Sequence, residues 1–254
     1  MIHTQLQVPA IVSREDWLQQ RKELLREEKE FLKQLEKINT KRRQLPMVEI
    51  QKDYTFNGPN GQVSFLDLFE GRNQLIVQHF MFDPDWEAGC RGCSLQTDNI
   101  GNLAHLHARN VTLVLISKAP LEKLEKFKKR MGWTFPWYSS SESDFNYDFH
   151  VTIDASRGSH VYNYENVDDL GASWKDWKGE MPGNSVFIRQ GDRIFHTYST
   201  YDRGCELLMG TLHYLDLTPF GRQEVWEKPN GRGEDKPGSW WRLHDDYEKK
   251  SDVG

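Results

Sequence analysis

The sequence has few cysteines, no long apolar run and no excess of basic charge. Its 254 residues include three cysteines, too few for a disulfide scaffold. The net charge is −5 and the isoelectric point is near 6.0, which gives no sign of nucleic-acid or membrane binding. The longest apolar runs, such as 111–116, are too short to span a bilayer, and the first residues lack the pattern of a signal peptide. We therefore expect a soluble cytoplasmic protein.

Several common enzyme signatures are also missing. The sequence contains no Gly-rich phosphate loop, no His-Glu-x-x-His and no Gly-x-Ser-x-Gly. In contrast, aromatic residues make up 12% of the chain and include nine Trp, which argues against disorder. The length is sufficient to bury a substantial core.

The segment 13–44 has the pattern of one long amphipathic helix. Ser13 is placed to cap its start, with Asp16 three residues later, and Pro46 follows its end. Apolar residues recur on one face at helical spacing, namely Trp17, Leu18, Leu24, Leu25, Phe31, Leu32, Leu35 and Ile38. Such a face fits either packing on the chain's own domain or a homodimer contact through this helix.

The middle of the chain alternates between strand and helix patterns. A hairpin is expected over 54–65 with Asn60-Gly61 at its turn, and a buried strand over 74–82. Helical spacing over 94–109, a strand at 111–116, a helix over 120–130 and a short strand at 135–138 follow. This order predicts an α/β domain with parallel strands. A second hairpin is expected from Ser185 onward.

These patterns predict a single domain with appendages. The expected parts are an N-terminal helical extension (1–46), a core (47–220) interrupted by an irregular insertion at about 139–184, and a C-terminal tail (221–254). No internal repeat or linker divides the chain.

Two of the cysteines stand at Cys-x-x-Cys spacing where the strand 74–82 gives way to a helix. A thiol at a helix N-terminus loses its proton more easily, so Cys90 is the candidate nucleophile, with the charge of Arg91 beside it. Cys93 lies most of one turn further and can resolve a mixed disulfide. A redox dithiol is one interpretation; a metal site and a pair of inert cysteines are the others.

Six stretches carry a resemblance to a known family, namely 13–17, 42–46, 78–82, 90–94, 187–199 and 215–222. Through them the chain resembles the DUF899 family, described as predicted thioredoxin-like dithiol-disulfide oxidoreductases. The stretch 56–69 is similar to the corresponding hairpin of peroxiredoxin-type proteins. The resemblance implies a thioredoxin-like fold with an N-terminal helical extension, an inserted loop region and a C-terminal extension. It implies thiol-disulfide exchange, without a cofactor, with a partner protein or small thiol.

The resemblance also places further residues at the expected site. In a thioredoxin-like arrangement the second hairpin follows the strand near the dithiol, so His196 is a candidate acid or base for Cys90. Alternatively, His196 completes a copper or zinc site with the two cysteines, or is an ordinary sheet histidine. Trp86, Arg91 and Tyr198 are candidate substrate-binding residues. A third possibility is peroxide reduction through a sulfenic acid at Cys90.

Thioredoxins proper differ from this sequence at two points. They carry Gly-Pro between the cysteines, where this chain has Arg-Gly, and they place a proline directly before the strand that faces the dithiol. The nearest candidate proline here is Pro182, three residues before the expected strand start at Ser185.

Overall fold

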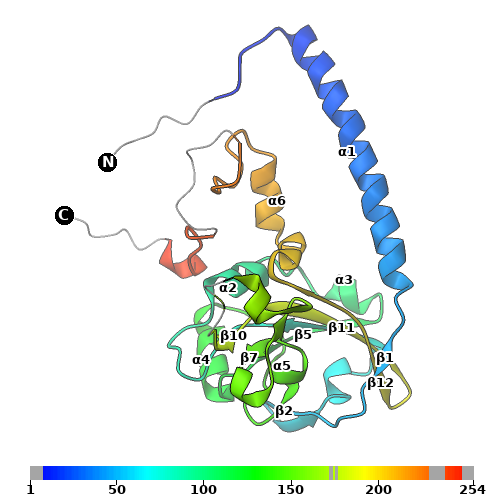
Figure 1. The fold of residues 1–254 in the computed structure, drawn as a ribbon, viewed down its shortest axis with the longest axis vertical. Helices are drawn as coiled ribbons and strands as arrows, with labels where there is room; N and C mark the ends of the chain where they lie inside the picture. The colour runs from blue at the N-terminus through cyan, green and yellow to red at the C-terminus, as the bar shows by residue number, and fades with distance from the viewer. Residues whose placement is uncertain (1–7, 172–173, 175–176, 229–237, 248–254) are drawn as a thin grey trace, which may run out of the picture. The chain divides into compact units, whose positions relative to one another are not determined.

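The computed structural model describes residues 8–171, 174, 177–228 and 238–247 (Figure 1). The chain divides into two compact units. One comprises Met1–Pro46 with Tyr214–Pro237, and the other Met47–His213 with Gly238–Gly254. Within the described ranges, no helix has both the length and the apolar character needed to cross a membrane.

The first unit contains the long helix that the sequence predicts. Helix α1 spans Arg14–Arg43, and the Ser13 hydroxyl oxygen accepts a hydrogen bond from the amide of Asp16 at 3.0 Å. The same hydroxyl donates to the Asp16 carboxylate at 2.7 Å, so the predicted cap is confirmed. None of the residues of α1, all of which are described, is buried. Helix α6 (Gly210–Asp216) contains the boundary between the units.

An eight-stranded sheet forms the centre of the second unit. Its strands lie in the order β1-β12-β11-β4-β5-β6-β2-β3, with β4, β5 and β6 parallel and the other pairs antiparallel. The strands are β1 (Val48–Glu49), β2 (Thr55–Gly58), β3 (Gly61–Ser64), β4 (Gln74–His79), β5 (Val111–Ser117), β6 (Trp137–Ser139), β11 (Gly183–Gln190) and β12 (Arg193–Tyr201).

Side chains on the two faces of the sheet belong to two separate apolar clusters. Along β5, Val114 and Ile116 enter one cluster, whereas Leu115 enters the other. We call the first the phenylalanine cluster, because it also holds Phe56, Phe65, Phe69, Phe145, Phe149 and Phe187. We call the second the dithiol cluster, because Cys93 belongs to it. The alternation follows from the two-residue period of a strand.

Helices and short elements complete the second unit. They are the helices α2 (Arg91–Asp98), α3 (Ala104–His107), α4 (Leu121–Arg130) and α5 (Phe145–Asp148), the short strands β7 (Thr152–Ile153), β8 (Val161–Tyr162), β9 (Glu165–Asn166) and β10 (Gly179–Glu180), and the 3₁₀ turns η1 (Asp67–Phe69), η2 (Ala155–Arg157), η3 (Val167–Leu170), η4 (Asp202–Leu208) and η5 (His244–Asp246). The expected insertion therefore has short regular elements within its described part.

Several boundaries differ from the sequence predictions; for example, β4 ends at His79 rather than at residue 82. The helical pattern over 94–109 is broken into α2 and α3, because Asn99 donates its side-chain amide to the Leu95 carbonyl oxygen at 2.7 Å and ends the first helix. Strand β11 begins at Gly183 rather than at Ser185. Pro182 therefore stands directly before β11, the strand that pairs antiparallel with β4.

Candidate active site

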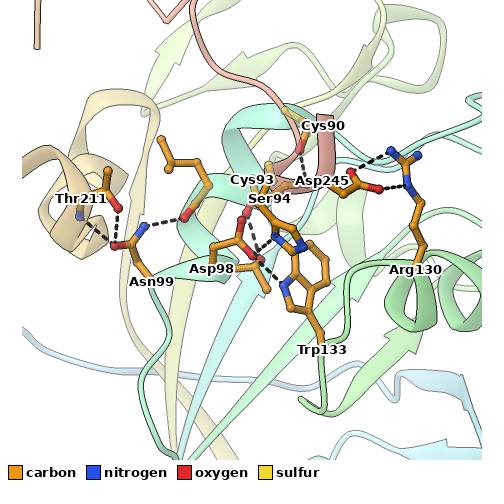
Figure 2. Close-up of polar contacts among 12 residues, drawn as sticks. Cys90, Cys93, Ser94, Asp98, Asn99, Arg130, Trp133, Thr211 and Asp245 are labelled. Carbon is orange, nitrogen blue, oxygen red and sulfur yellow. Dashed lines mark hydrogen bonds and ion pairs between the residues drawn. The ribbon is translucent and has the colours of Figure 1, made fainter. Parts of the chain in front are cut away.

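Cys90 occupies the cap position at the start of α2, in the loop that follows β4. Its amide donates to the Met81 carbonyl oxygen at 3.0 Å, and its own carbonyl oxygen accepts from the amide of Ser94 at 2.9 Å. The Ser94 hydroxyl donates to the same carbonyl oxygen at 2.8 Å (Figure 2). These bonds fix Cys90 at the end of the helix where the first-turn amides have no intrahelical acceptor. The predicted position of the thiol is thus confirmed.

The two thiols of the pair have opposite electrostatic environments. A hydrogen bond from the Cys93 thiol, assisted by the amides of Cys93 and Gly92 and by the charge of Arg91, lowers the pKa of Cys90 to about 7 against the opposing effect of burial. The same hydrogen bond, with burial and the nearby Cys90 charge, raises the pKa of Cys93. Cys90 is partly exposed and Cys93 is only 3% exposed. Both thiols are free. This pattern favours Cys90 as the thiolate and Cys93 as its hydrogen-bond donor.

The glycines beside the two cysteines are required by close packing. A Cβ atom on Gly89 would lie 2.5 Å from the Phe80 ring, and one on Gly92 would lie 2.8 Å from the Trp241 ring. Both distances are too short for a real side chain, so only glycine allows these rings to contact the loop and the first turn of α2. In the stretch W-E-A-G-C-R-G-C, the two glycines are therefore needed for packing, beside the two cysteines that supply the thiols.

A buried glutamine on β4 supports the inner side of α2. The Gln78 side-chain amide donates to the Cys93 carbonyl oxygen at 3.2 Å and to the Thr97 hydroxyl at 3.1 Å. Gln78 is 1% exposed, and the Met81 amide donates to Cys93 Sγ at 3.4 Å. Sequence reasoning missed this role of Gln78. The available signal was a polar residue in the apolar run 74–82, which must find buried partners.

A C-terminal segment, residues 238–247, packs against the outer side of α2. Leu243 is 3% exposed and belongs to the dithiol cluster, while the Trp241 ring lies against Gly92. Asp98, at the end of α2, accepts hydrogen bonds from Trp133 Nε1 and from the ring of His244, each at 2.8 Å (Figure 2). These contacts place part of the expected C-terminal tail at the dithiol.

An ion pair attaches the same segment, residues 238–247, to helix α4. The Arg130 guanidinium at the end of α4 makes two hydrogen bonds to the Asp245 carboxylate, at 2.8 and 2.9 Å (Figure 2). It also reaches the Asp246 carboxylate at 3.2 Å. A bidentate pair of this kind fixes the orientation of the segment relative to α4 more strongly than a single contact does.

The three predicted substrate-binding residues lie on different parts of the fold. Arg91 is exposed in the first turn of α2. Trp86 is 36% exposed in the preceding loop, where its carbonyl oxygen accepts from Lys123 Nζ at 2.9 Å. Tyr198 lies on β12 opposite Val186, two strands from β4. Arg91 and Trp86 thus share the segment of Cys90, whereas Tyr198 comes from a more distant strand.

His196 faces the other side of the sheet. Its ring packs against Phe149 and Phe187 of the phenylalanine cluster, with centroid distances of 5.4 Å, and its Nε2 lies 2.7 Å from Ser199 Oγ. Cys93 lies in the dithiol cluster on the opposite face. The structure therefore does not bring His196 to Cys90, which is a correction to both the acid-base and the metal-ligand interpretation. In the described ranges, no three His, Cys, Asp or Glu side chains are placed to hold a metal ion.

His196 instead belongs to a buried chain of hydroxyl and imidazole groups. Ser199 Oγ lies 2.7 Å from Ser185 Oγ, which lies 2.7 Å from His79 Nε2. His79 is 1% exposed, and burial lowers its pKa to about 3, so it is a neutral core histidine.

These features define the fold class. A Cys-x-x-Cys pair begins the helix that follows a central strand, the next strand is parallel to it, and an antiparallel hairpin joins its other edge. This is a thioredoxin-like fold with an N-terminal helix and an inserted region.

The chain belongs to the family described as "Bacterial protein of unknown function (DUF899)", whose model matches residues 6–247. No curated protein matches the sequence.

Solved structures give weaker similarities. Peroxidoxin BcpB from Mycobacterium tuberculosis is 15% identical, with 67% of this chain and 97% of that chain covered and a TM-score of 0.42. Peroxiredoxin Q of Xanthomonas campestris is 11% identical, with 63% and 89% covered and a TM-score of 0.39. A Chlorobium tepidum protein assigned provisionally as the thiol:disulfide interchange protein DsbE is 13% identical, with 67% and 97% covered and a TM-score of 0.39.

Proposed function

We propose that the protein is a thiol-disulfide oxidoreductase in which Cys90 attacks a disulfide and Cys93 resolves the intermediate. The observation that carries this proposal is the asymmetry of the pair. Cys90 is partly exposed at a helix start, with a pKa of about 7, whereas Cys93 is buried, with a raised pKa. An attacking thiol performs best when its pKa is near the ambient pH.

The reaction divides into two exchange steps. The Cys90 thiolate attacks one sulfur of a substrate disulfide, forms a mixed disulfide and releases the first substrate thiolate. Cys93 then loses its proton and attacks Cys90 Sγ, which forms the Cys90–Cys93 disulfide and releases the second substrate thiolate. The substrate gains two electrons and the protein loses two. Turnover requires a dithiol reductant that returns the pair to its reduced form.

The surroundings of the pair support both steps. The amides of Gly92 and Cys93 stabilise the Cys90 thiolate before attack. The hydrogen bond from the Met81 amide to Cys93 Sγ opposes the rise in the Cys93 pKa and so assists loss of its proton in the second step. Arg91, exposed beside the thiolate, attracts anionic disulfide substrates such as glutathione disulfide.

A direct test uses glutathione disulfide as the probe. The reduced protein is mixed with graded ratios of reduced and oxidised glutathione, alkylated and analysed by intact mass. We expect a reversible two-electron transition confined to Cys90 and Cys93. Cys93→Ser should accumulate a glutathione adduct on Cys90, and Cys90→Ser should form neither the adduct nor the disulfide. Cys205→Ser is the matched control, because Cys205 is buried in a separate cluster and should leave the transition unchanged.

Two results would count against the proposal. If Cys90→Ser were oxidised by glutathione disulfide at an unchanged rate, Cys90 would not be the attacking nucleophile. In the second result, hydrogen peroxide oxidises Cys90 to a sulfenic acid that then forms the Cys90–Cys93 disulfide. If this disulfide formed faster with hydrogen peroxide than with glutathione disulfide, the protein would be identified as a peroxide reductase.

A further inference from the structure

Helix α1 carries an apolar face that no described residue of its own unit buries. The apolar residues form pairs that recur every seven positions, at Trp17-Leu18, Leu24-Leu25 and Phe31-Leu32. Their exposed fractions range from 37% for Leu25 to 63% for Phe31. A strict seven-residue apolar repeat is the pattern of helices that pair by supercoiling, because it keeps one seam facing a partner helix.

Two opposite charges lie in the middle of this face. At 100° per residue, Arg21 and Glu28 fall between the rows formed by the first and second members of the pairs. Within one chain, Arg21 Nη2 lies 2.8 Å from Glu28 Oε2, a pair separated by seven residues. Charged residues inside an otherwise apolar seam reduce stability but fix the register and orientation of paired helices.

We propose that α1 pairs with α1 of a second copy of this chain in antiparallel orientation, centred between Leu24 and Leu25. In this register, two residues face each other when their residue numbers add up to 49. Trp17 then faces Leu32, and Leu18 faces Phe31, so apolar residues meet apolar residues along the seam.

The two charges of the seam select this arrangement. In the antiparallel register, Arg21 of each copy faces Glu28 of the other. In a parallel pair, Arg21 would face Arg21 and Glu28 would face Glu28, and like charges placed together are strongly unfavourable. The intrachain pair thus becomes a set of two symmetric pairs between copies, as a twofold axis requires.

The basic end of the helix favours the same orientation. Residues 36–43 contain four basic residues and one acidic residue, a net charge of +3. A parallel pair would place these two ends side by side. The antiparallel register places them at opposite ends of a pair that overlaps over residues 14–35, about 33 Å of helix.

Charge reversal tests this register on the full-length chain. Sedimentation of the unchanged protein at micromolar concentration should give twice the chain mass of 29.9 kDa. Arg21→Glu or Glu28→Arg alone should weaken the dimer at least tenfold, because each places like charges in the seam. The double reversal R21E/E28R should restore the dimer to within about threefold of the original dissociation constant.

A matched control and a folding control accompany the test. Lys33→Glu breaks another intrachain ion pair, Lys33–Glu30 at 3.5 Å, on the opposite face of α1, and should leave dimerisation unchanged. Circular dichroism should remain unchanged in all variants, because no residue of α1 is buried. A monomeric unchanged protein would overturn the proposal. A dimer that tolerates either single reversal, or that the double reversal fails to restore, would overturn the antiparallel register.

Discussion

The reactivity of Cys90 provides a quantitative test of the site. A fall of the Cys90 pKa from 9.0 to about 7 corresponds to about 3 kcal/mol in favour of the thiolate. At pH 7 about half of Cys90 would be thiolate, against about one part in a hundred for a thiol with a pKa of 9. The alkylation rate of Cys90 by iodoacetamide, followed by peptide mass between about pH 5 and pH 10, should therefore reach half its plateau near pH 7.

Removal of the main cause should move this midpoint. The hydrogen bond from the Cys93 thiol is the largest contribution to the lowered pKa of Cys90. Cys93→Ala removes this donor and should shift the midpoint upward by about one pH unit, which is the size of one hydrogen bond to a charged group. Cys205→Ala is the matched control, since it removes a buried thiol that does not bond to Cys90, and its midpoint should stay near 7.

Two results would refute this reasoning. A midpoint at about 8.5 or above in the unchanged protein would mean that the helix start and the Cys93 thiol do not stabilise the thiolate. An unchanged midpoint in Cys93→Ala would mean that the backbone amides alone, rather than the partner thiol, set the pKa of Cys90.

Three further predictions concern packing and burial in the fold. Gly92→Ala should cost about 1 to 3 kcal/mol of unfolding free energy, because the added carbon would lie 2.8 Å from a tryptophan ring, whereas Gly101→Ala, with nothing within 4 Å, should cost less than about 1. Leu243→Ala should cost about 2 to 5 kcal/mol, while Leu217→Ala, at a side chain 82% exposed, should be nearly neutral in the same urea titration. Burial raises the pKa of Glu180 from 4.5 to about 7, so the folded state favours the protonated carboxyl group. This contribution to the unfolding free energy is fully present below about pH 4.5 and is lost as the pH rises through 7. Glu180→Gln should remove up to about 3 kcal/mol of this pH dependence, measured by urea unfolding at pH 5 and pH 8.

The helix and strand patterns predicted most of the regular elements. The cap at Ser13, the strand from Gln74, the helix ending at Arg130 and the hairpin at Asn60 all appear where local chemistry places them. These elements depend on caps, turns and apolar period, which are properties of neighbouring residues. The split between α2 and α3 depends on Asn99, whose side chain also accepts from the Thr211 amide far along the chain, so local spacing missed it.

The position of His196 illustrates what a strand pattern leaves open. Side chains alternate between the faces of a sheet, and one extra residue reverses the assignment. The β11–β12 pairing shifts between Val186 and Phe187, so Phe187 pairs with His196 and Thr197 is left over. Such a bulge depends on pairing with the neighbouring strand and has no signature in this sequence. His196 consequently contacts the phenylalanine cluster rather than the dithiol.

The sequence by itself determined the dithiol. The spacing of Cys90 and Cys93 after a buried strand was enough to place a thiol at a helix start, because a helix N-terminus and its dipole arise within one turn of chain. Only the tertiary structure decided which other groups surround the helix that carries that thiol. Gln78 beneath the helix and the segment 238–247 outside it are brought there by packing across the sheet and by contacts between residues more than a hundred positions apart. Such contacts form because buried apolar surface and paired polar groups lower the free energy of the whole fold, and no short stretch of sequence encodes them.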